Sequence, residues 1–169
     1  FQILFFRSFI GLIIIGSLIG INGTDQIKTR HFKLHFIRNI AHFGGQFGWF
    51  YGIAYISLAK VFAIEFTVPI WTAILAVILL KEHLTLPRIF SVILGVAGML
   101  IILRPGLEVI DFASLAVLLG AICYGLAHTL TRKISLSDPP IAVLFYMTLI
   151  QLPIGFFLSI SNWNTPSIS

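Results

Sequence analysis

The chain has 169 residues, of which 58% are hydrophobic and only 10% are charged. Soluble domains carry roughly 25% charged residues, so this composition leaves too few polar side chains to cover a water-facing surface. The net charge of +5 does not come from a basic run interleaved with aromatic residues, which argues against a nucleic-acid partner. We therefore expect an integral membrane protein.

Six apolar stretches qualify as candidate spans, since a helix needs roughly 20 apolar residues to cross the hydrocarbon core. They are Ile3–Ile21, Phe36–Leu58, Val61–Leu80, Ile89–Leu103, Phe112–Leu130 and Ala142–Ile160. Thr85 as a helix N-cap, followed by Pro87, would start the fourth helix earlier. The polar–apolar alternation of barrel strands is absent. The sequence thus predicts an all-α polytopic membrane protein with about six transmembrane helices.

The positive side chains of the short connections indicate the orientation of these helices, because Lys and Arg are enriched in cytoplasmic loops. Eight of the 11 Lys and Arg residues lie in or beside the connections after the first, third and fifth helices. The other side holds Lys60 and Arg104, with Arg7 in the outer part of the first helix. We therefore expect those three connections to be cytoplasmic, in a multi-pass protein of the cytoplasmic (inner) membrane.

The second to fourth helices carry sequence motifs in a definite order. They are RNIAHFGGQ at 38–46 leading into WFY at 49–51, FAIEFTVPIW at 62–71, LKEHLT at 80–85, and GVAG at 95–98 before RPG at 104–106. Together they resemble the EamA-like branch of the drug/metabolite transporter superfamily. The resemblance is strongest to bacterial members with an E-F-T-x-P-x-W fourth helix and a G-E-x-L-T motif after it. Lys81 departs from this pattern, because the family usually has glycine before the glutamate.

The resemblance implies a ten-helix transporter built from two inverted five-helix repeats, which this chain would enter at helix 2 and leave after helix 7. Residues 1–106 would form most of the first repeat, helices 2 to 5. Residues 107–169 would form the start of the second repeat, helices 6 and 7. Inverted repeats are a common transporter architecture. Under this interpretation the chain is a fragment that does not transport alone.

Glu65 and Pro69 make the third helix a candidate element of the translocation path. A carboxylate inside a membrane span is costly and by default suggests a functional site. Pro69 has no N–H and displaces the carbonyl four positions before it, which belongs to Glu65. Such a break is tolerated only against protein or a water-filled cavity. The alternative is that Glu65 lies near the outer interface and pairs with Lys60 or Arg7.

A polar face on the second helix extends this candidate path. At 100° per residue, one narrow face holds Arg38, His42, Gln46 and Trp49. We interpret His42, Gln46 and Trp49 as substrate-binding or translocation-path residues, with hydrogen bonding between helices as the alternative. Arg38 and Glu82 are candidates for a cytoplasmic gate, although each could equally be a solvated charge at the membrane rim.

Glycines form a second stripe on the same helix. Gly44, Gly48 and Gly52 recur at four-residue spacing, which lets two membrane helices approach closely. We interpret this stripe as a packing surface. Two more polar residues have open roles: Arg7 could bind an anionic substrate, and His128 could bind substrate or relay protons, or simply be solvated.

The resemblance and the polar residues at depth favour a secondary transporter. It would move a small organic metabolite or drug-like compound across the cytoplasmic membrane by alternating access. The sequence has no G-x-x-x-x-G-K loop, so the chain carries no ATP motor of its own, and we expect no cofactor. The expected partners are the lipid bilayer and a small-molecule substrate.

Two alternatives of other classes stay open. In the first, the chain is a small self-associating protein similar to multidrug exporters, and it forms a homodimer through its glycines. In the second, His42, Glu65 and His128 act as an intramembrane enzyme. The sequence has no H-E-x-x-H motif or comparable ligand spacing, so we expect no metal site and no enzyme activity.

Overall fold

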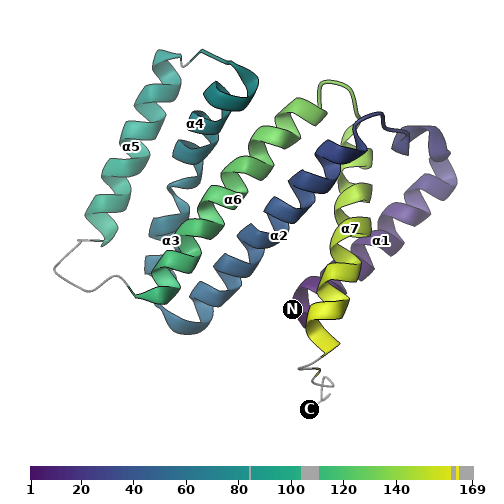
Figure 1. Ribbon diagram of the computed structural model, residues 1–169, viewed down its shortest axis with the longest axis horizontal. Helices are drawn as coiled ribbons and strands as arrows, with labels where there is room; N and C mark the ends of the chain where they lie inside the picture. Colours follow the sequence, from purple (N-terminus) through teal and green to yellow (C-terminus); the bar gives the residue numbers. More distant parts are fainter. Residues whose placement is uncertain (84, 104–110, 161–162, 164–169) are drawn as a thin grey trace. The chain divides into compact units, whose positions relative to one another are not determined.

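The structure is a computed structural model that describes residues 1–83, 85–103, 111–160 and 163. In order, the helices are α1 (Gln2–Asn22), the 3-10 helix η1 (Thr24–Ile27), α2 (Phe32–Tyr55), α3 (Leu58–Glu65), α4 (Val68–Leu80), α5 (Leu86–Leu103), α6 (Phe112–Ile134) and α7 (Pro140–Ser159) (Figure 1). The described residues form no strand, so the predicted all-α class is confirmed.

Four segments of the described chain are long and apolar enough to cross a membrane. They are α1, α3 together with α4, α6 and α7. The helix α5 has 18 residues, and its sequence is predominantly apolar from Ile89 to Leu103. The helix α2 has 24 residues, but Lys33, Arg38 and Asn39 make its first half polar. The protein is a multi-pass, all-α membrane protein, as the composition predicts.

The described chain folds as two compact units. One unit contains α1, η1, the first eight residues of α2, from Phe32 to Asn39, and α7. The other runs from Ile40 to Lys133 and contains the rest of α2 with α3, α4, α5 and α6.

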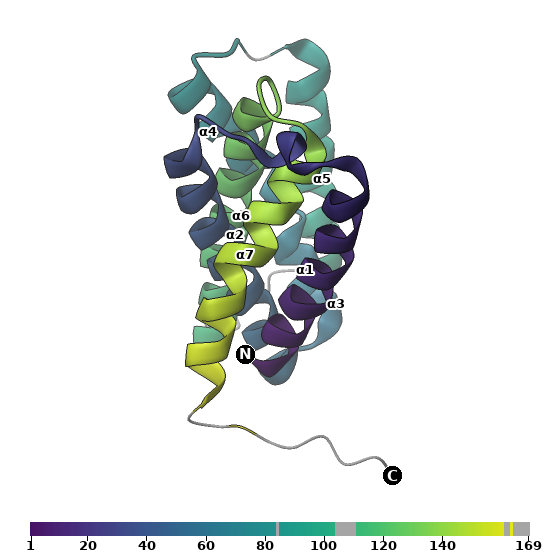
Figure 2. The ribbon, with the colours of Figure 1, turned by 90° about the vertical axis from the view of Figure 1, so that its right-hand side faces the viewer.

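In the first unit, α1 packs along α7 (Figure 1, Figure 2). A Cβ atom added to Gly155 would lie 3.0 Å from the backbone N of Phe5, and one added to Gly11 would lie 2.8 Å from Cγ2 of Thr148. Residues with higher numbers on α1 therefore contact residues with lower numbers on α7, so the two helices are antiparallel. The same register places Ser8 of α1 level with the middle of α7.

In the second unit, glycines bring α2 and α6 into backbone contact. A Cβ atom on Gly48 would lie 2.5 Å from the carbonyl oxygen of Ala116, and one on Gly120 would lie 3.1 Å from the carbonyl oxygen of Gly45. Side chains larger than hydrogen would hold these helices apart, which is how small residues act in membrane helix packing. The glycine stripe is therefore a packing surface, as predicted, and it contacts α6 of the same chain.

Candidate functional site

The third predicted span is interrupted near its start. The helix α3 ends at Glu65 and α4 begins at Val68, so only Phe66 and Thr67 join them. Thr67 closes the end of α3, because its Oγ1 donates to the carbonyl oxygen of Ile64 over 2.6 Å. Proline stands in the first turn of α4, where its missing N–H leaves no hydrogen bond unmade. The helix break predicted from the proline is confirmed, and it falls at the carboxylate.

The carboxylate at this break is hydrogen-bonded to the second helix. Nε1 of Trp49, on α2, donates to Oε2 of Glu65 over 2.8 Å, and both side chains are half-buried. Hydrogen bonds to a charged acceptor are roughly twice as strong as those between neutral groups. Lys60, which the sequence offers as an alternative partner of Glu65, instead pairs with Asp111 at an Nζ–Oδ2 distance of 2.7 Å.

A narrow crevice surrounds this hydrogen bond. The space between its atoms measures about 160 Å³, and no part of it is wide enough for a water molecule. Its walls are made by Gly45, Trp49, Glu65, Val117, Gly120, Ala121 and Tyr124. The ring of Tyr124 lies directly over Gly45, because a Cβ atom there would come within 2.8 Å of the ring. Two aromatic side chains and one carboxylate therefore converge between α2, α3 and α6.

The other predicted path residues, His42, Gln46 and Pro69, are not among those that line this crevice. The ring of His42 meets Tyr124 edge to face at 5.4 Å between ring centroids. Gln46 is buried, with 3% of its surface exposed, and within the described part of the chain its Oε1 has no hydrogen-bond partner. Pro69 is exposed on the first turn of α4 and is not among the residues that line the crevice. Their role in a translocation path stays a prediction.

The two gate candidates belong to different units. In the second unit, Glu82 follows α4 and pairs with Arg132 at the end of α6, with 2.8 Å between Oε2 and Nη1. In the first unit, Arg38 is buried and its Nη1 donates to Oδ1 of Asn39 over 2.6 Å. Each is engaged in a specific contact, and the gate assignment stays a prediction.

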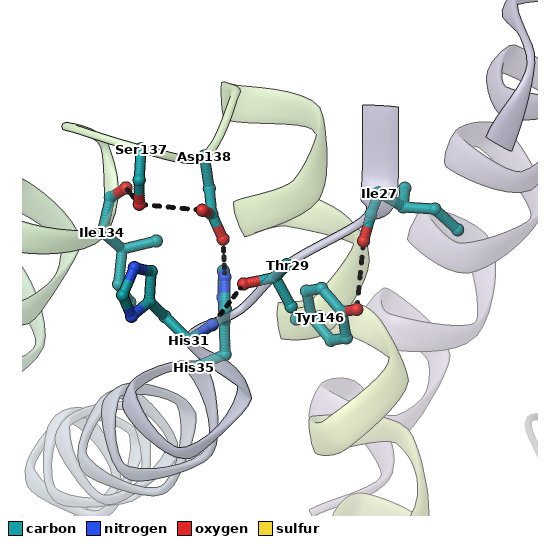
Figure 3. Close-up of polar contacts among 8 residues, drawn as sticks. All are labelled: Ile27, Thr29, His31, His35, Ile134, Ser137, Asp138 and Tyr146. Atoms are coloured by element: carbon teal, nitrogen blue, oxygen red, sulfur yellow. Dashed lines mark hydrogen bonds and ion pairs between the residues drawn. The ribbon is translucent and has the colours of Figure 1, made fainter. Parts of the chain in front are cut away.

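Sequence reasoning missed a buried polar cluster at one end of the first unit (Figure 3). His35 is fully buried and its Nε2 lies 2.9 Å from Oδ2 of Asp138, in the turn before α7. Oγ of Ser137 donates to the other carboxylate oxygen over 2.8 Å. Nearby, the hydroxyl of Tyr146 donates to the carbonyl oxygen of Ile27 over 3.0 Å. The cluster ties the start of α2 to the turn that begins α7.

The electrostatics of this cluster favour an ionised Asp138. Burial of its carboxyl group acts to raise the pKa, but this effect is outweighed. Hydrogen bonds from Thr29, His35 and Ser137, together with the charge of His35, hold the pKa below its ordinary value. The signal available in sequence was limited to a histidine and an aspartate separated by 103 positions.

Metal chemistry finds no support in the described residues. Within these ranges, no three His, Cys, Asp or Glu side chains gather closely enough to hold a metal ion. Cys123 of α6 is a half-buried free cysteine. The crevice presents two aromatic side chains and one carboxylate.

Comparison with known proteins gives the family context of this site. The model of the EamA-like transporter family matches residues 1–104. An S-adenosylmethionine uptake transporter of Rickettsia conorii is 27% identical over 167 residues, covering 99% of this chain and 57% of that protein. A riboflavin transporter of Brucella anthropi is 26% identical over 160 residues, covering 95% of this chain and 56% of that protein. No solved structure matches the chain.

Proposed function

Because this chain belongs to the EamA-like transporter family, we propose that it is part of a secondary transporter that moves a small organic metabolite across the cytoplasmic membrane by alternating access. The chain spans 57% of the length of the Rickettsia relative, so the activity of the whole protein is part of this proposal. Relatives are named for S-adenosylmethionine and for riboflavin, both of which combine a heteroaromatic ring with a polar chain. We propose a substrate of that class.

The observation that carries the proposal is the hydrogen bond between Trp49 and Glu65 at the helix break. A ligand with a heteroaromatic ring could stack on Trp49 or Tyr124, while a cationic or N–H group could replace the indole N–H at the carboxylate. The crevice admits no water as it stands, so binding requires the indole and the carboxylate to separate. Glu65 would thus bind either Trp49 or the ligand. An alternating-access carrier needs a binding site with two such states.

The domain organisation and orientation complete the proposal. Residues 1–106 would belong to the first inverted repeat and residues 107–169 to the second. That boundary lies outside the described residues. The connections after α1, after α4 and after α6 would face the cytoplasm, because they hold most of the Lys and Arg residues.

Uptake by the complete protein in proteoliposomes tests the proposal. We expect saturable accumulation of labelled S-adenosylmethionine or riboflavin, and a fall of at least tenfold when Glu65 is replaced by glutamine. Glu65→Asp keeps the charge and should retain part of the activity. As a matched control, Asp25→Asn removes a carboxylate that pairs with Lys28 on the surface. Full activity of a correctly inserted Glu65→Gln protein would remove Glu65 from the path.

A further inference from the structure

A groove between α2 and α6, which we call the α2–α6 groove, is separate from the crevice around Glu65. Its volume is about 340 Å³, and its walls consist of glycine, alanine, leucine and aromatic residues together with Cys123. It shares only Gly120 with the residues that line the crevice. Among the described residues, no charged or amide side chain lines this groove, so a polar solute would lose its hydrogen bonds to water there. The groove therefore suits an apolar ligand.

The α2–α6 groove is long and narrow. At one end the ring of Tyr51 meets Phe112, the first residue of α6, edge to face at 6.1 Å between ring centroids. At the other end a Cβ atom on Gly44 would lie 3.4 Å from Sγ of Cys123, the twelfth residue of α6. The stretch of helix from Phe112 to Cys123 is roughly 16 Å long, at ~1.5 Å per residue. About 340 Å³ spread over that length leaves a channel narrower than an α-helix, whose diameter with side chains is roughly 10–12 Å.

One end of this groove lies at the edge of the membrane. Asp111 immediately precedes Phe112, and its carboxylate pairs with Lys60 at 2.7 Å. Charged groups are costly inside the hydrocarbon core, so this pair places the end of the groove at the interface. Tyr51 and Tyr55, whose ring centroids lie 4.6 Å apart, fit the aromatic belt that is found there. Since the hydrocarbon core is roughly 30 Å thick, a groove of ~16 Å that starts at the interface ends near the middle of the bilayer.

We propose that the α2–α6 groove binds one acyl chain of a membrane phospholipid, whose head group lies at the interface beside Lys60 and Asp111. The apolar walls, the narrow channel and a length close to that of one leaflet each match an extended hydrocarbon chain. A further helix would be too wide for the channel. Leu115 and Leu119 line the groove and are 43% and 54% exposed, so the groove is open along its side. The lipid site does not rest on the transport function.

Native mass spectrometry of the complete protein tests the site. The protein is purified in a short-chain detergent and incubated with palmitoyl-oleoyl-phosphatidylethanolamine, and the phospholipids that it retains are counted. Gly44→Leu and Leu119→Trp place larger side chains in the groove, and each should retain one phospholipid fewer than wild type. Leu94→Trp adds bulk at an exposed position of α5 that does not line the groove, and it should retain the wild-type number.

Labelling of Cys123 tests the depth that the acyl chain reaches. N-ethylmaleimide is applied to the delipidated protein in the same detergent, and the modified peptide is quantified by mass spectrometry. Palmitoyl-oleoyl-phosphatidylethanolamine should slow the labelling roughly tenfold. Dihexanoyl-phosphatidylethanolamine should not slow it, because its chains are too short to reach Cys123 from the interface. In Leu119→Trp neither lipid should protect the thiol.

The outcomes decide between a lipid and other occupants of the groove. An unchanged phospholipid count in Gly44→Leu and Leu119→Trp would overturn the proposal, and so would equal protection of Cys123 by the two lipids. A thiol that does not react in delipidated, folded protein would also overturn it, because the groove would then be filled by the protein itself. If Gly44→Leu does not fold, Leu119→Trp carries the test, because Leu119 is exposed. Neither experiment measures uptake, so the transport proposal can fail while the lipid site stands.

Discussion

Trp49 and Glu65 are 16 positions apart in sequence and 2.8 Å apart in space, between the indole Nε1 and the carboxylate Oε2. One residue belongs to a helix that is in backbone contact with α6, and the other ends a helix that stops inside a span. The hydrogen bond therefore connects α2, which is fixed by its contact with α6, to the interrupted span that contains α3 and α4. Its strength and its breakage are accessible to experiment.

A double-mutant cycle on this pair should show strong coupling. Trp49→Phe removes the donor and Glu65→Gln removes the charge, and each should lower the free energy of unfolding by roughly 1.5–3 kcal/mol, the range for hydrogen bonds to charged groups. The double variant should lose little more than either single variant. Denaturation in detergent micelles measures all four proteins. Strict additivity would contradict the bond, and Trp163→Phe with Glu65→Gln is the additive control.

The contact between α2 and α6 should be sensitive to a single methyl group. Gly48→Ala places a Cβ atom 2.5 Å from the carbonyl oxygen of Ala116. This is a backbone atom, which cannot rotate away as the end of a flexible side chain could. Overpacking of this kind typically lowers the free energy of unfolding by roughly 1–3 kcal/mol. Gly16→Ala, where nothing lies within 4 Å, should be neutral or stabilising. Equal Tm values for the two alanine variants would contradict the close approach.

The ion pair at the start of α6 should make stability depend on acid pH. Hydrogen bonds from Lys60 and from the backbone N–H of Ser114 lower the pKa of Asp111 to about 2, from 3.8. Because the folded-state pKa is the lower one, the stabilisation is present above about pH 4 and is lost as pH falls towards about 2. Asp111→Asn should flatten this part of the Tm–pH curve. An unchanged acid limb in the variant would contradict the assignment.

Removing the carboxylate of the buried cluster should destabilise the first unit. Asp138→Asn takes the charged partner from fully buried His35, and we expect a loss of roughly 1–3 kcal/mol. The control is Asp25→Asn, which breaks an exposed pair with Lys28 and should change stability by less than about 1 kcal/mol. Thermal unfolding measures both. Similar losses in the two variants would argue against a special role for the buried pair.

Helix positions in this protein follow from local sequence. The apolar run that begins at Phe112 predicts α6 from its first residue, and Thr85 with Pro87 correctly predicts an earlier start for α5. The second helix begins at Phe32, four residues before the predicted start, because its first turn contains polar residues that an apolar count leaves out. Proline at 69 indicated the break in the third span, since proline fits the first turn of a helix but disturbs the helix interior.

Pairings between distant residues do not follow from local sequence. His35 meets Asp138 across 103 positions, and Lys60 meets Asp111 across 51. Neither pair has a spacing typical of a motif. From the sequence alone, Lys60 and His35 could each have paired with another carboxylate. Gln151 of α7, whose Oε1 accepts a hydrogen bond from Nη2 of Arg7 over 2.9 Å, was not singled out either, because a glutamine in an apolar helix indicates polarity but not its partner. Only the packed arrangement of helices decides these contacts.

The position of Glu65, just before the two-residue connection between α3 and α4, also has an electrostatic consequence. A helix carries a partial negative charge at its C-terminal end, and Glu65 is the last residue of α3. A carboxylate at that end is unfavourable by roughly 0.3–1 kcal/mol in an exposed helix. We expect a cationic group of a bound solute at Glu65 to offset this penalty. Occupancy of Glu65 by such a group would then stabilise the connection between α3 and α4.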